Sequence, residues 1–268
     1  MNDKSRTLIA SLLEVFNTEC GGRLSVSAHN PATGELLEID PDYSFSSASV
    51  IKVPVLVALY AQRDLGRLEL DEVLPVKQSD IVGGSGVLQE MHVGLPVTLR
   101  DLAHLMIVVS DNTATNMLIE RIDVTFIHKM MRDLGFANIR IERKLMDLEA
   151  RDRGLDNRLA AGDTRELFEK ILLGPLPPLT NDSRAECIEI LKRQQHGEKL
   201  LGLLPEETKA AHKPGGLSDI SHDAGIVFLP DGGWYSVAIF SGGFTSSKIA
   251  GRTLAKLSRM IWDHFTGG

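Results

Sequence analysis

Apolar and polar residues alternate near both ends of the chain with a period of two, which is typical of half-buried β-strands. Near the N-terminus this pattern covers residues 24–29, and a second strand is predicted to end near Ile39. The alternation returns at residues 226–228 and 235–239. We therefore expect strands from the two ends of the chain to meet in one antiparallel sheet.

In the middle of the chain, apolar residues recur at every third or fourth position, as on one face of a helix. Two further helices are predicted near the ends, over residues 5–17 and about 246–265. Asp163 is expected to cap one central helix, and Asp182 or Ser183 another. The central helices are predicted over residues 56–64, 99–109, 113–122, 126–134, 164–172 and 184–194.

This order of elements predicts an α/β fold of the α+β type, in which terminal helices flank an antiparallel sheet and an all-helical lobe is inserted in the chain. The lobe with the sheet is expected to comprise residues 1–46 and 201–268. The helical lobe is expected to comprise residues 47–200.

The composition is that of an ordinary soluble globular protein, with 43% hydrophobic and 24% charged residues and a net charge of -7. An acidic chain argues against a nucleic-acid surface, which needs clustered Lys and Arg. The longest apolar stretch, residues 53–60, is too short to span a bilayer. Cys20 and Cys187 fit neither a disulfide framework nor a metal cluster. We expect a monomer that binds no nucleic acid and has no metal site and no cofactor.

Ser49 and Lys52 form a Ser-x-x-Lys motif, a spacing that chance supplies roughly once in a chain of this composition. On a helix the two side chains share one face and can hydrogen-bond. Pro54 supports a helix that begins near Ser49, because proline is tolerated in a first turn. There, backbone N–H groups favour a developing alkoxide, and an unprotonated Lys52 would accept the serine proton. Alternatively, Ser49 caps a core helix and Lys52 is a surface charge.

Ser110, Asp111 and Asn112 form a second motif, which is much rarer by chance. It follows one predicted helix and precedes another, so we expect a turn between two helices. In an acyl-transfer site, Ser110 would pass a proton to the leaving nitrogen and Asn112 would bind a substrate amide oxygen. Asp111 would fix the turn. Alternatively, all three are ordinary helix-capping residues.

Lys213 begins a third motif, Lys-Pro-Gly-Gly, at the expected edge of the sheet. Gly215 and Gly216 let a ligand approach the backbone closely, and the N–H of Gly216 is expected to join that of Ser49 in an oxyanion hole. Lys213 would supply positive charge for a substrate carboxylate and for Ser110. Alternatively, Lys213 is a surface lysine before a turn.

The order Ser-x-x-Lys, Ser-Asp-Asn and Lys-x-Gly resembles that of the class A β-lactamases and their penicillin-binding relatives. The resemblance covers most of the chain. It implies a β-lactamase-like fold and a serine hydrolase that acts on a cyclic amide through an acyl-enzyme. Asn116 matches an asparagine that orients the deacylating carboxylate in that family.

In class A enzymes a glutamate in a loop after the helical core activates the deacylating water, and leucine and asparagine follow it three and four positions later. Glu149 is the nearest match, but Asp152 and Arg153 stand at those later positions. Asn157 is a candidate to replace the missing asparagine. Alternatively, Glu149 is a surface residue paired with Arg151 or Arg153.

Pro214 stands where the family commonly has a threonine or serine whose hydroxyl helps to bind the substrate carboxylate, and proline lacks that group. Ser218, His212 and His222 are candidates to compensate. No histidine pairs with Ser49 in a Gly-x-Ser-x-Gly elbow, which disfavours a conventional Ser-His-Asp hydrolase.

We therefore expect a serine β-lactamase with Ser49, Lys52, Ser110, Glu149 and Lys213 as catalytic residues, acting on a small β-lactam or peptide-like substrate. The doubt over deacylation leaves alternatives open: a penicillin-binding D,D-peptidase, an esterase, a glutaminase-like hydrolase, or a β-lactam sensor that deacylates slowly. The chain is leaderless as written, which by itself indicates the cytoplasm. The resemblance implies instead a periplasmic or secreted protein with a trimmed signal peptide.

Overall fold

The computed structural model describes residues 3–267, and the chain divides into two compact units. The first unit comprises residues Met1–Val50, Leu159–Glu169 and His196–Gly268. The second unit comprises residues Ile51–Arg158 and Lys170–Gln195.

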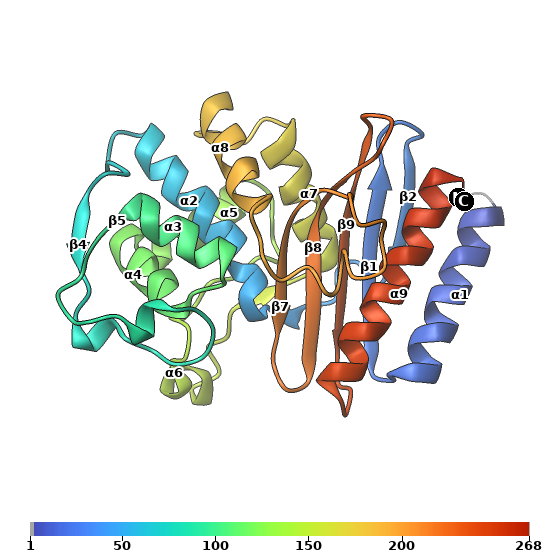
Figure 1. Cartoon of the computed structure of the whole chain (residues 1–268), viewed down its shortest axis with the longest axis horizontal. Helices are drawn as coiled ribbons and strands as arrows, with labels where there is room; N and C mark the ends of the chain where they lie inside the picture. Colours follow the sequence, from blue (N-terminus) through green and yellow to red (C-terminus); the bar gives the residue numbers. More distant parts are fainter. Residues whose placement is uncertain (1–2, 268) are drawn as a thin grey trace. The chain divides into compact units, whose positions relative to one another are not determined.

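The first unit is built on a five-stranded antiparallel sheet with the strand order β2-β1-β9-β8-β7 (Figure 1). Strands from the two ends of the chain pair between β1 and β9, where Val26 lies opposite Ile239. The prediction of one antiparallel sheet is therefore confirmed. Its strands are β1 (Arg23–Asn30), β2 (Glu35–Ile39), β7 (Ala210–Gly216), β8 (Ile220–Phe228) and β9 (Trp234–Gly242), and a further two-residue strand is β3 (Phe45–Ser46).

Helices α1 (Asp3–Glu19) and α9 (Ser247–Thr266) lie side by side against the sheet (Figure 1). Phe16 of α1 and Ile261 of α9 are fully buried in one core with Val26 of β1. The two terminal helices thus bury the apolar face of the sheet, as the period of their apolar residues predicts.

The opposite face of the sheet contacts the beginning of α7 (Ala161–Leu172). Arg165 donates from Nε to Ser27 Oγ, and the Glu169 carboxylate hydrogen-bonds the His29 ring. Ser27 and His29 alternate along β1 with the core-facing residues, so they point to the other face. These contacts explain why residues 159–169 group with the sheet, whereas the sequence placed them in the helical lobe.

Strands β7 and β8 show why the alternating pattern covered only part of the sheet. All but the last residue of each strand are buried, and these include polar residues such as Lys213 and Asp223, so polar positions do not mark a solvent-exposed face. Pro214 lies in β7, at the edge of the sheet. Proline is tolerated there because an edge strand does not need every backbone N–H for the ladder.

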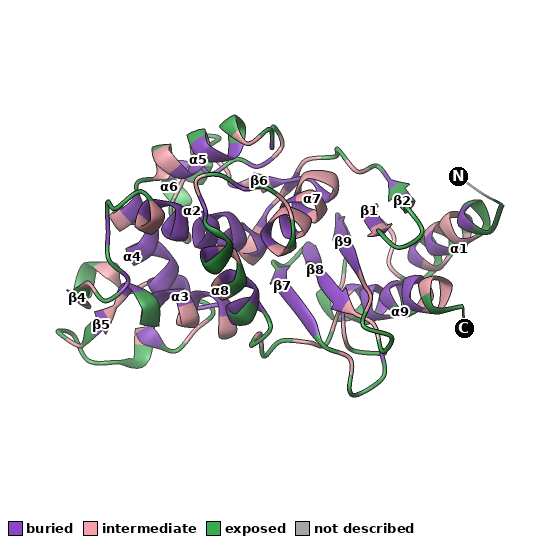
Figure 2. Cartoon of the chain, turned by 90° about the horizontal axis from the view of Figure 1, so that it is seen from above, coloured by how far each residue is buried: buried purple, intermediate pink, exposed green. Residues whose placement is uncertain are grey.

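The second unit is a bundle of helices around α2 (Lys52–Asp64), in which every residue from Lys52 to Gln62 is buried. Figure 2 shows α2 and α4 buried along most of their lengths. The other helices are α3 (Leu99–Val108), α4 (Asn112–Ile122), α5 (Val124–Asp133), α6 (Leu148–Asp152) and α8 (Asn181–Leu191). The short elements are β4 (Val73–Pro75), which pairs with β5 (Pro96–Thr98), β6 (Arg158–Leu159), and the 3₁₀ turns η2 (Gln78–Asp80) and η3 (Leu88–Glu90).

The predicted helix caps are wrong at two helices, because both helices begin earlier than their apolar pattern. Helix α7 begins at Ala161, so Asp163 lies inside its first turn. Helix α8 is capped by Thr180, whose hydroxyl accepts a hydrogen bond from the N–H of Ser183. None of the helices in the described part of the chain combines the length and the hydrophobicity that crossing a membrane requires.

Candidate active site

Ser49 lies in a single 3₁₀ turn, η1 (Ala48–Ile51), that runs directly into α2. Pro54 occupies the first turn of α2. The prediction of a helix that begins close to Ser49 is therefore confirmed. Ala48 has a φ of 44°, a conformation that is uncommon for a residue other than glycine. This backbone conformation turns the chain immediately before Ser49.

Strand β7 passes directly against the backbone of Ser49, and Gly215 is its point of closest approach. A Cβ atom added to Gly215 would lie 2.9 Å from the backbone nitrogen of Ser49 and 3.1 Å from the side chains of Ala48 and Val50. Only glycine fits this spacing without movement of one of the two segments. The first unit therefore brings Ser49 together with the Lys213–Gly216 segment.

Lys52, Ser110 and Asn112 form a buried cluster in the second unit. The Nζ atom of Lys52 donates to the carbonyl oxygen of Ser110 at 2.6 Å, to Ser110 Oγ at 3.1 Å and to Asn112 Oδ1 at 2.8 Å. The side chain of Lys52 is fully buried. Asn112 is itself oriented, because its Nδ2 donates to the carbonyl oxygen of Gly83. The structure thus joins the first two sequence motifs through Lys52.

Asp111 fixes the turn between α3 and α4, as the sequence predicted. Its carboxylate accepts hydrogen bonds from the N–H groups of Ala114, Val87 and Leu88. The neighbouring Ser110 has a φ of 58°, in the left-handed region. Three backbone donors on one buried carboxylate offset the cost of its burial and hold Ser110 in this conformation.

Lys213 and Lys199 place two ammonium groups on the same stretch of β7. The Nζ of Lys213 donates to the carbonyl oxygen of Pro214 at 2.9 Å, and the Nζ of Lys199 donates to that of Gly215 at 2.6 Å. Burial lowers the pKa of Lys213 to about 7; the carboxylate of Asp223 opposes this shift, and the charge of Lys199 adds to it. Burial also lowers the pKa of Lys199.

The residues considered as substitutes for the missing hydroxyl at position 214 lie in different environments. Ser218 is exposed in the turn after β7, while His212 and His222 are buried. His222 Nε2 lies 3.0 Å from the carbonyl oxygen of Ser46, and its Nδ1 accepts from the N–H of Ser241. These two contacts make Nε2 the protonated nitrogen. Burial lowers the pKa of His222 to about 4, so this ring is neutral and its role is structural.

His212 is also committed within the sheet unit. Its Nδ1 lies 3.0 Å from a carboxylate oxygen of Asp223, and the other carboxylate oxygen accepts from the N–H of Leu200. The half-buried Lys199 beside Gly215 is thus the residue that the sequence analysis missed at this strand. The spacing between Lys199 and Lys213 matches no known motif. The sequence also assigned Lys199 to the helical lobe, so nothing predicted that it would lie beside a strand of the sheet.

The family resemblance implies that Asn116 orients Glu149. In the structure the side chain of Asn116 instead hydrogen-bonds the backbone of Leu145. The Nδ2 of Asn116 donates to the carbonyl oxygen of Leu145 at 2.9 Å, and its Oδ1 accepts from the N–H of Leu145 at 2.7 Å. Glu149 lies in the first turn of α6, with its side chain exposed. Asn157 binds the backbone of Glu142 and Arg143 through its amide group.

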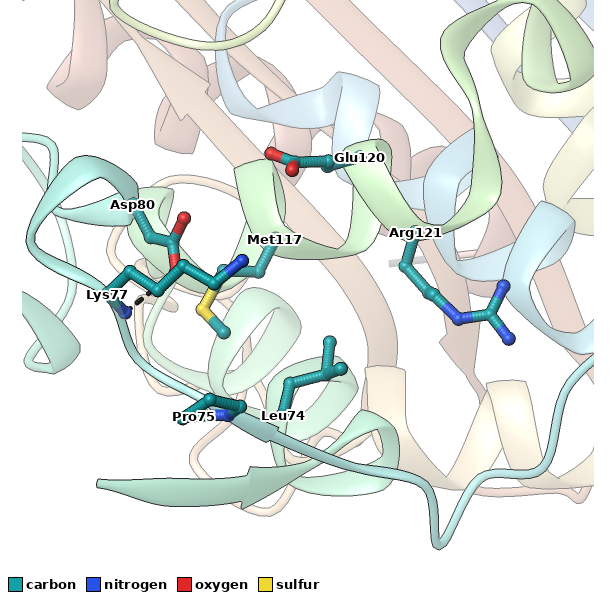
Figure 3. A pocket seen from close by; sticks show the side chains of 7 residues that line it. All are labelled: Leu74, Pro75, Lys77, Asp80, Met117, Glu120 and Arg121. Carbon is teal, nitrogen blue, oxygen red and sulfur yellow. Dashed lines mark hydrogen bonds between the residues drawn. The ribbon is translucent and has the colours of Figure 1, made fainter. Parts of the chain in front are cut away.

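Two adjoining pockets of the second unit lie next to Asn116. The first pocket, shown in Figure 3, is lined by none of the predicted site residues. The second pocket shares three lining residues with the first and extends to Asn116 and Leu145. No cluster of three or more acidic, histidine or cysteine side chains suited to a metal ion occurs among residues 3–267. The first pocket is lined by Leu74, Pro75, Lys77, Asp80, Met117, Glu120 and Arg121.

Comparisons with known proteins agree with this geometry. The model of the "Beta-lactamase enzyme family" matches residues 7–265. A β-lactamase of Rhodobacter capsulatus is 29% identical over 252 residues, which cover 91% of this chain and 83% of that protein. The structure of PBP-A superposes with a TM-score of 0.89 at 27% identity, and that of an ancestral class A β-lactamase (GNCA) with a TM-score of 0.88 at 25% identity. These superpositions cover 98% and 96% of this chain, and 97% and 100% of the other chains. The chain therefore belongs to the β-lactamase enzyme family and has the class A β-lactamase fold.

Proposed function

We propose that the protein is a serine hydrolase that opens the amide bond of β-lactams through an acyl ester on Ser49. The observation that carries this proposal is the buried ammonium group of Lys52, which is held by oxygen atoms of Ser110 and Asn112. Burying a lysine among neutral oxygen atoms costs stability, so a chemical role explains its place better than a structural one.

The proposed acylation uses the residues of all three motifs. Ser49 Oγ attacks the lactam carbonyl carbon while Lys52, after losing its own proton, accepts the serine proton. Ser110 passes a proton to the leaving nitrogen. The N–H groups of Ser49 and Gly216 stabilise the negative charge on the carbonyl oxygen.

Substrate binding is assigned to the residues around these groups. Asn112 binds the side-chain amide of the substrate, and Lys213 binds its carboxylate, with Gly215 forming the adjacent wall. Ser218, exposed in the turn after β7, is a further polar contact in this proposal. Water then hydrolyses the ester, and Glu149 remains the predicted base for that step.

The relatives support this substrate class. The curated relatives include β-lactamases, and a variant of PBP-A has been solved as an acyl-enzyme with penicillin G. We propose the same chemistry here, in a monomeric protein that meets β-lactams in the periplasm or outside the cell.

Intact-protein mass spectrometry with penicillin G tests the proposed function. We expect a mass increase equal to that of the whole antibiotic, located on Ser49, because ring opening loses no atoms. The Ser49→Ala variant should lose the adduct, and the matched Ser46→Ala variant should keep it. A wild-type protein that never forms the adduct and never hydrolyses nitrocefin would refute the proposal. Lys52→Ala provides a second test, since loss of the base should slow acylation by roughly 100-fold or more.

A second candidate function is a penicillin-binding protein whose adduct persists. It is favoured by one observation, the pairing of Asn116 with the backbone of a leucine. The two candidates share acylation and differ in the lifetime of the ester, which the same mass spectra measure over time.

A further inference from the structure

A cavity of about 350 Å³ lies beside helix α5, within the second unit, and none of its lining residues belongs to the three motifs. His128 and Arg132 of α5 line it, and because they are four residues apart they share one face of the helix. The rest of the lining comes from the segment that follows α5 and consists of Ala137, Arg140 and Glu142. Two arginines and one histidine therefore surround this cavity together with a single acidic residue.

The segment that carries these residues is basic in an otherwise acidic chain. Residues 124–144 contain five Lys and Arg residues against two Asp and Glu residues, a local charge of +3, whereas the whole chain has a net charge of -7. Arg132 and Arg140, which line the cavity, form no ion pair with any residue that the structure describes. The other three basic side chains of the segment are paired, as Lys129–Asp133, Arg143–Asp156 and Lys144–Glu120.

Glu142, the acidic residue of the lining, is already engaged by the backbone. Its Oε2 accepts a hydrogen bond from the N–H of Asp156 at 3.2 Å, and its own N–H donates to Asn157 Oδ1 at 2.9 Å. Glu142 therefore does not neutralise the two arginines, although it lines the same cavity. Like charges that face one cavity repel each other and attract an anion from solution.

The ring of His128 offers this cavity a hydrogen-bond donor. Its Nδ1 is buried without a hydrogen-bond partner, while the residue as a whole is half-buried. Buried N–H groups without an acceptor are rarer than buried acceptors without a donor, so the neutral ring carries its proton on Nε2. The N–H of Nε2 is then the donor at the accessible edge of the ring.

We propose that this cavity binds the phosphate group of a small phosphate monoester. Arg132 and Arg140 bind phosphate oxygen atoms through the paired N–H groups of their guanidinium groups, and His128 donates from Nε2 to a further oxygen. A phosphate monoester has three acceptor oxygens and close to two negative charges at pH 7, which match two guanidinium groups better than one carboxylate does. A volume of about 350 Å³ is in the range of small-molecule sites, so an organic group on the phosphate also fits.

Titration of the full-length protein with inorganic phosphate and with ribose 5-phosphate, at constant ionic strength, tests this proposal. The backbone amide signals of α5 in NMR spectra report the binding. We expect one saturable site with a dissociation constant for inorganic phosphate on the order of 1 mM or lower. Tighter binding of ribose 5-phosphate would support a site for a monoester. Loss of the signal change when phosphate is replaced by chloride would support specificity for the oxyanion.

Three single variants and a matched control assign the binding to named side chains. Arg132→Gln and Arg140→Gln should each weaken phosphate binding roughly 10-fold or more, because each removes charge-assisted hydrogen bonds. His128→Phe, which keeps a ring without the donor, should weaken it roughly 2- to 10-fold. Arg252→Gln, at an exposed arginine of α9, should bind as the wild type does.

Several results would overturn the proposal, and all are independent of whether Ser49 is acylated. One is a signal change that rises linearly with phosphate and never saturates. Another is an affinity that survives both Arg132→Gln and Arg140→Gln, or that falls equally in Arg252→Gln. Acetate that binds as tightly as phosphate would show that the cavity does not recognise a phosphate group.

A measurement on the unaltered protein keeps the proposal testable if a variant does not fold. Phenylglyoxal modifies accessible guanidinium groups, and both Arg132 and Arg140 are exposed. Saturating phosphate should slow the modification of these two arginines by roughly 10-fold, because the occupied site blocks the reagent. The modification of Arg252 should proceed unchanged, as peptide mass spectrometry can show. Equal rates with and without phosphate at Arg132 and Arg140 would contradict the assigned site.

Discussion

The ammonium group of Lys199 lies 2.6 Å from the carbonyl oxygen of Gly215, on the strand that also carries Lys213. The Nζ of Lys199 also donates a hydrogen bond to the carbonyl oxygen of His222, in the neighbouring strand β8, at 3.3 Å. Its nitrogen would lie 3.5 Å from a Cβ added to Gly216, so the charge sits beside the exposed end of β7. Lys199 therefore places an ammonium group beside the Pro214–Gly216 segment, where the sequence lacks the family's hydroxyl group.

We expect Lys199→Met to lower the second-order rate constant of acylation by penicillin G roughly 10- to 100-fold, since a charge-assisted hydrogen bond to the carboxylate is lost. The methyl ester of penicillin G, which lacks that charge, should be affected little. Lys248→Met, at an exposed lysine of α9, serves as the control. Equal losses with the acid and the ester would show a purely structural role for Lys199.

The pH dependence of acylation should reveal the loss of the proton from the Lys213 ammonium group. Burial lowers the pKa of Lys213 to about 7, so its charge is lost as the pH rises through 7. Binding of a carboxylate requires the protonated form, and the rate constant for penicillin G relative to its methyl ester should fall by about tenfold per pH unit above that value. At saturating penicillin G the fall should move to higher pH, because the bound anion stabilises the ammonium form. A ratio that stays constant from pH 6 to pH 9 would contradict this assignment.

The approach of Gly215 to Ser49 predicts a catalytic cost for a single methyl group. In Gly215→Ala the new Cβ would lie 2.9 Å from the Ser49 nitrogen, so β7 or the nucleophile must move. We expect acylation to slow by about 10- to 100-fold, with the fold retained according to circular dichroism. Gly251→Ala in α9 is the control, because a Cβ added there meets no neighbouring atom. Unchanged acylation in Gly215→Ala would show that the site tolerates this shift.

The elements that were predicted from the sequence are those in which apolar and polar residues keep a regular period. The alternation in β1 and the spacing in α9 are of this kind, and both elements were found, although β1 is buried on both faces. In β8 three consecutive polar residues, Ser221, His222 and Asp223, are all buried, so the pattern revealed only the last residues of the strand. Helix α2 is buried all round, so its apolar spacing alone placed its start at Leu56, one turn too late, whereas Pro54 correctly indicated a start close to Ser49.

The site was predictable where its residues form local motifs and unpredictable where they meet through the fold. Ser110 and Asn112 stand together in the chain, and the sequence placed them in the turn that the structure has. The partner of Asn116 lies 29 residues away, and that of Lys199 lies 16 residues away. Periodicity and spacing contain no information on such pairs, because they depend on how separate elements pack.

Burial of His222 makes the protein sensitive to acid. The pKa of this ring is lowered from 6.5 to about 4 in the folded state, so between these values the unfolded chain binds a proton that the folded protein does not. The free energy of unfolding should therefore fall as the pH drops from 6.5 towards 4. His222→Gln removes the titrating group and should flatten this fall between pH 6.5 and pH 5, at the cost of a lower urea midpoint at pH 7, since the ring stacks on Phe240. His92→Gln, at an exposed histidine, should leave the slope as in the wild type. Urea titrations at a series of pH values measure both quantities, and an unchanged slope in His222→Gln would assign the acid sensitivity to other groups.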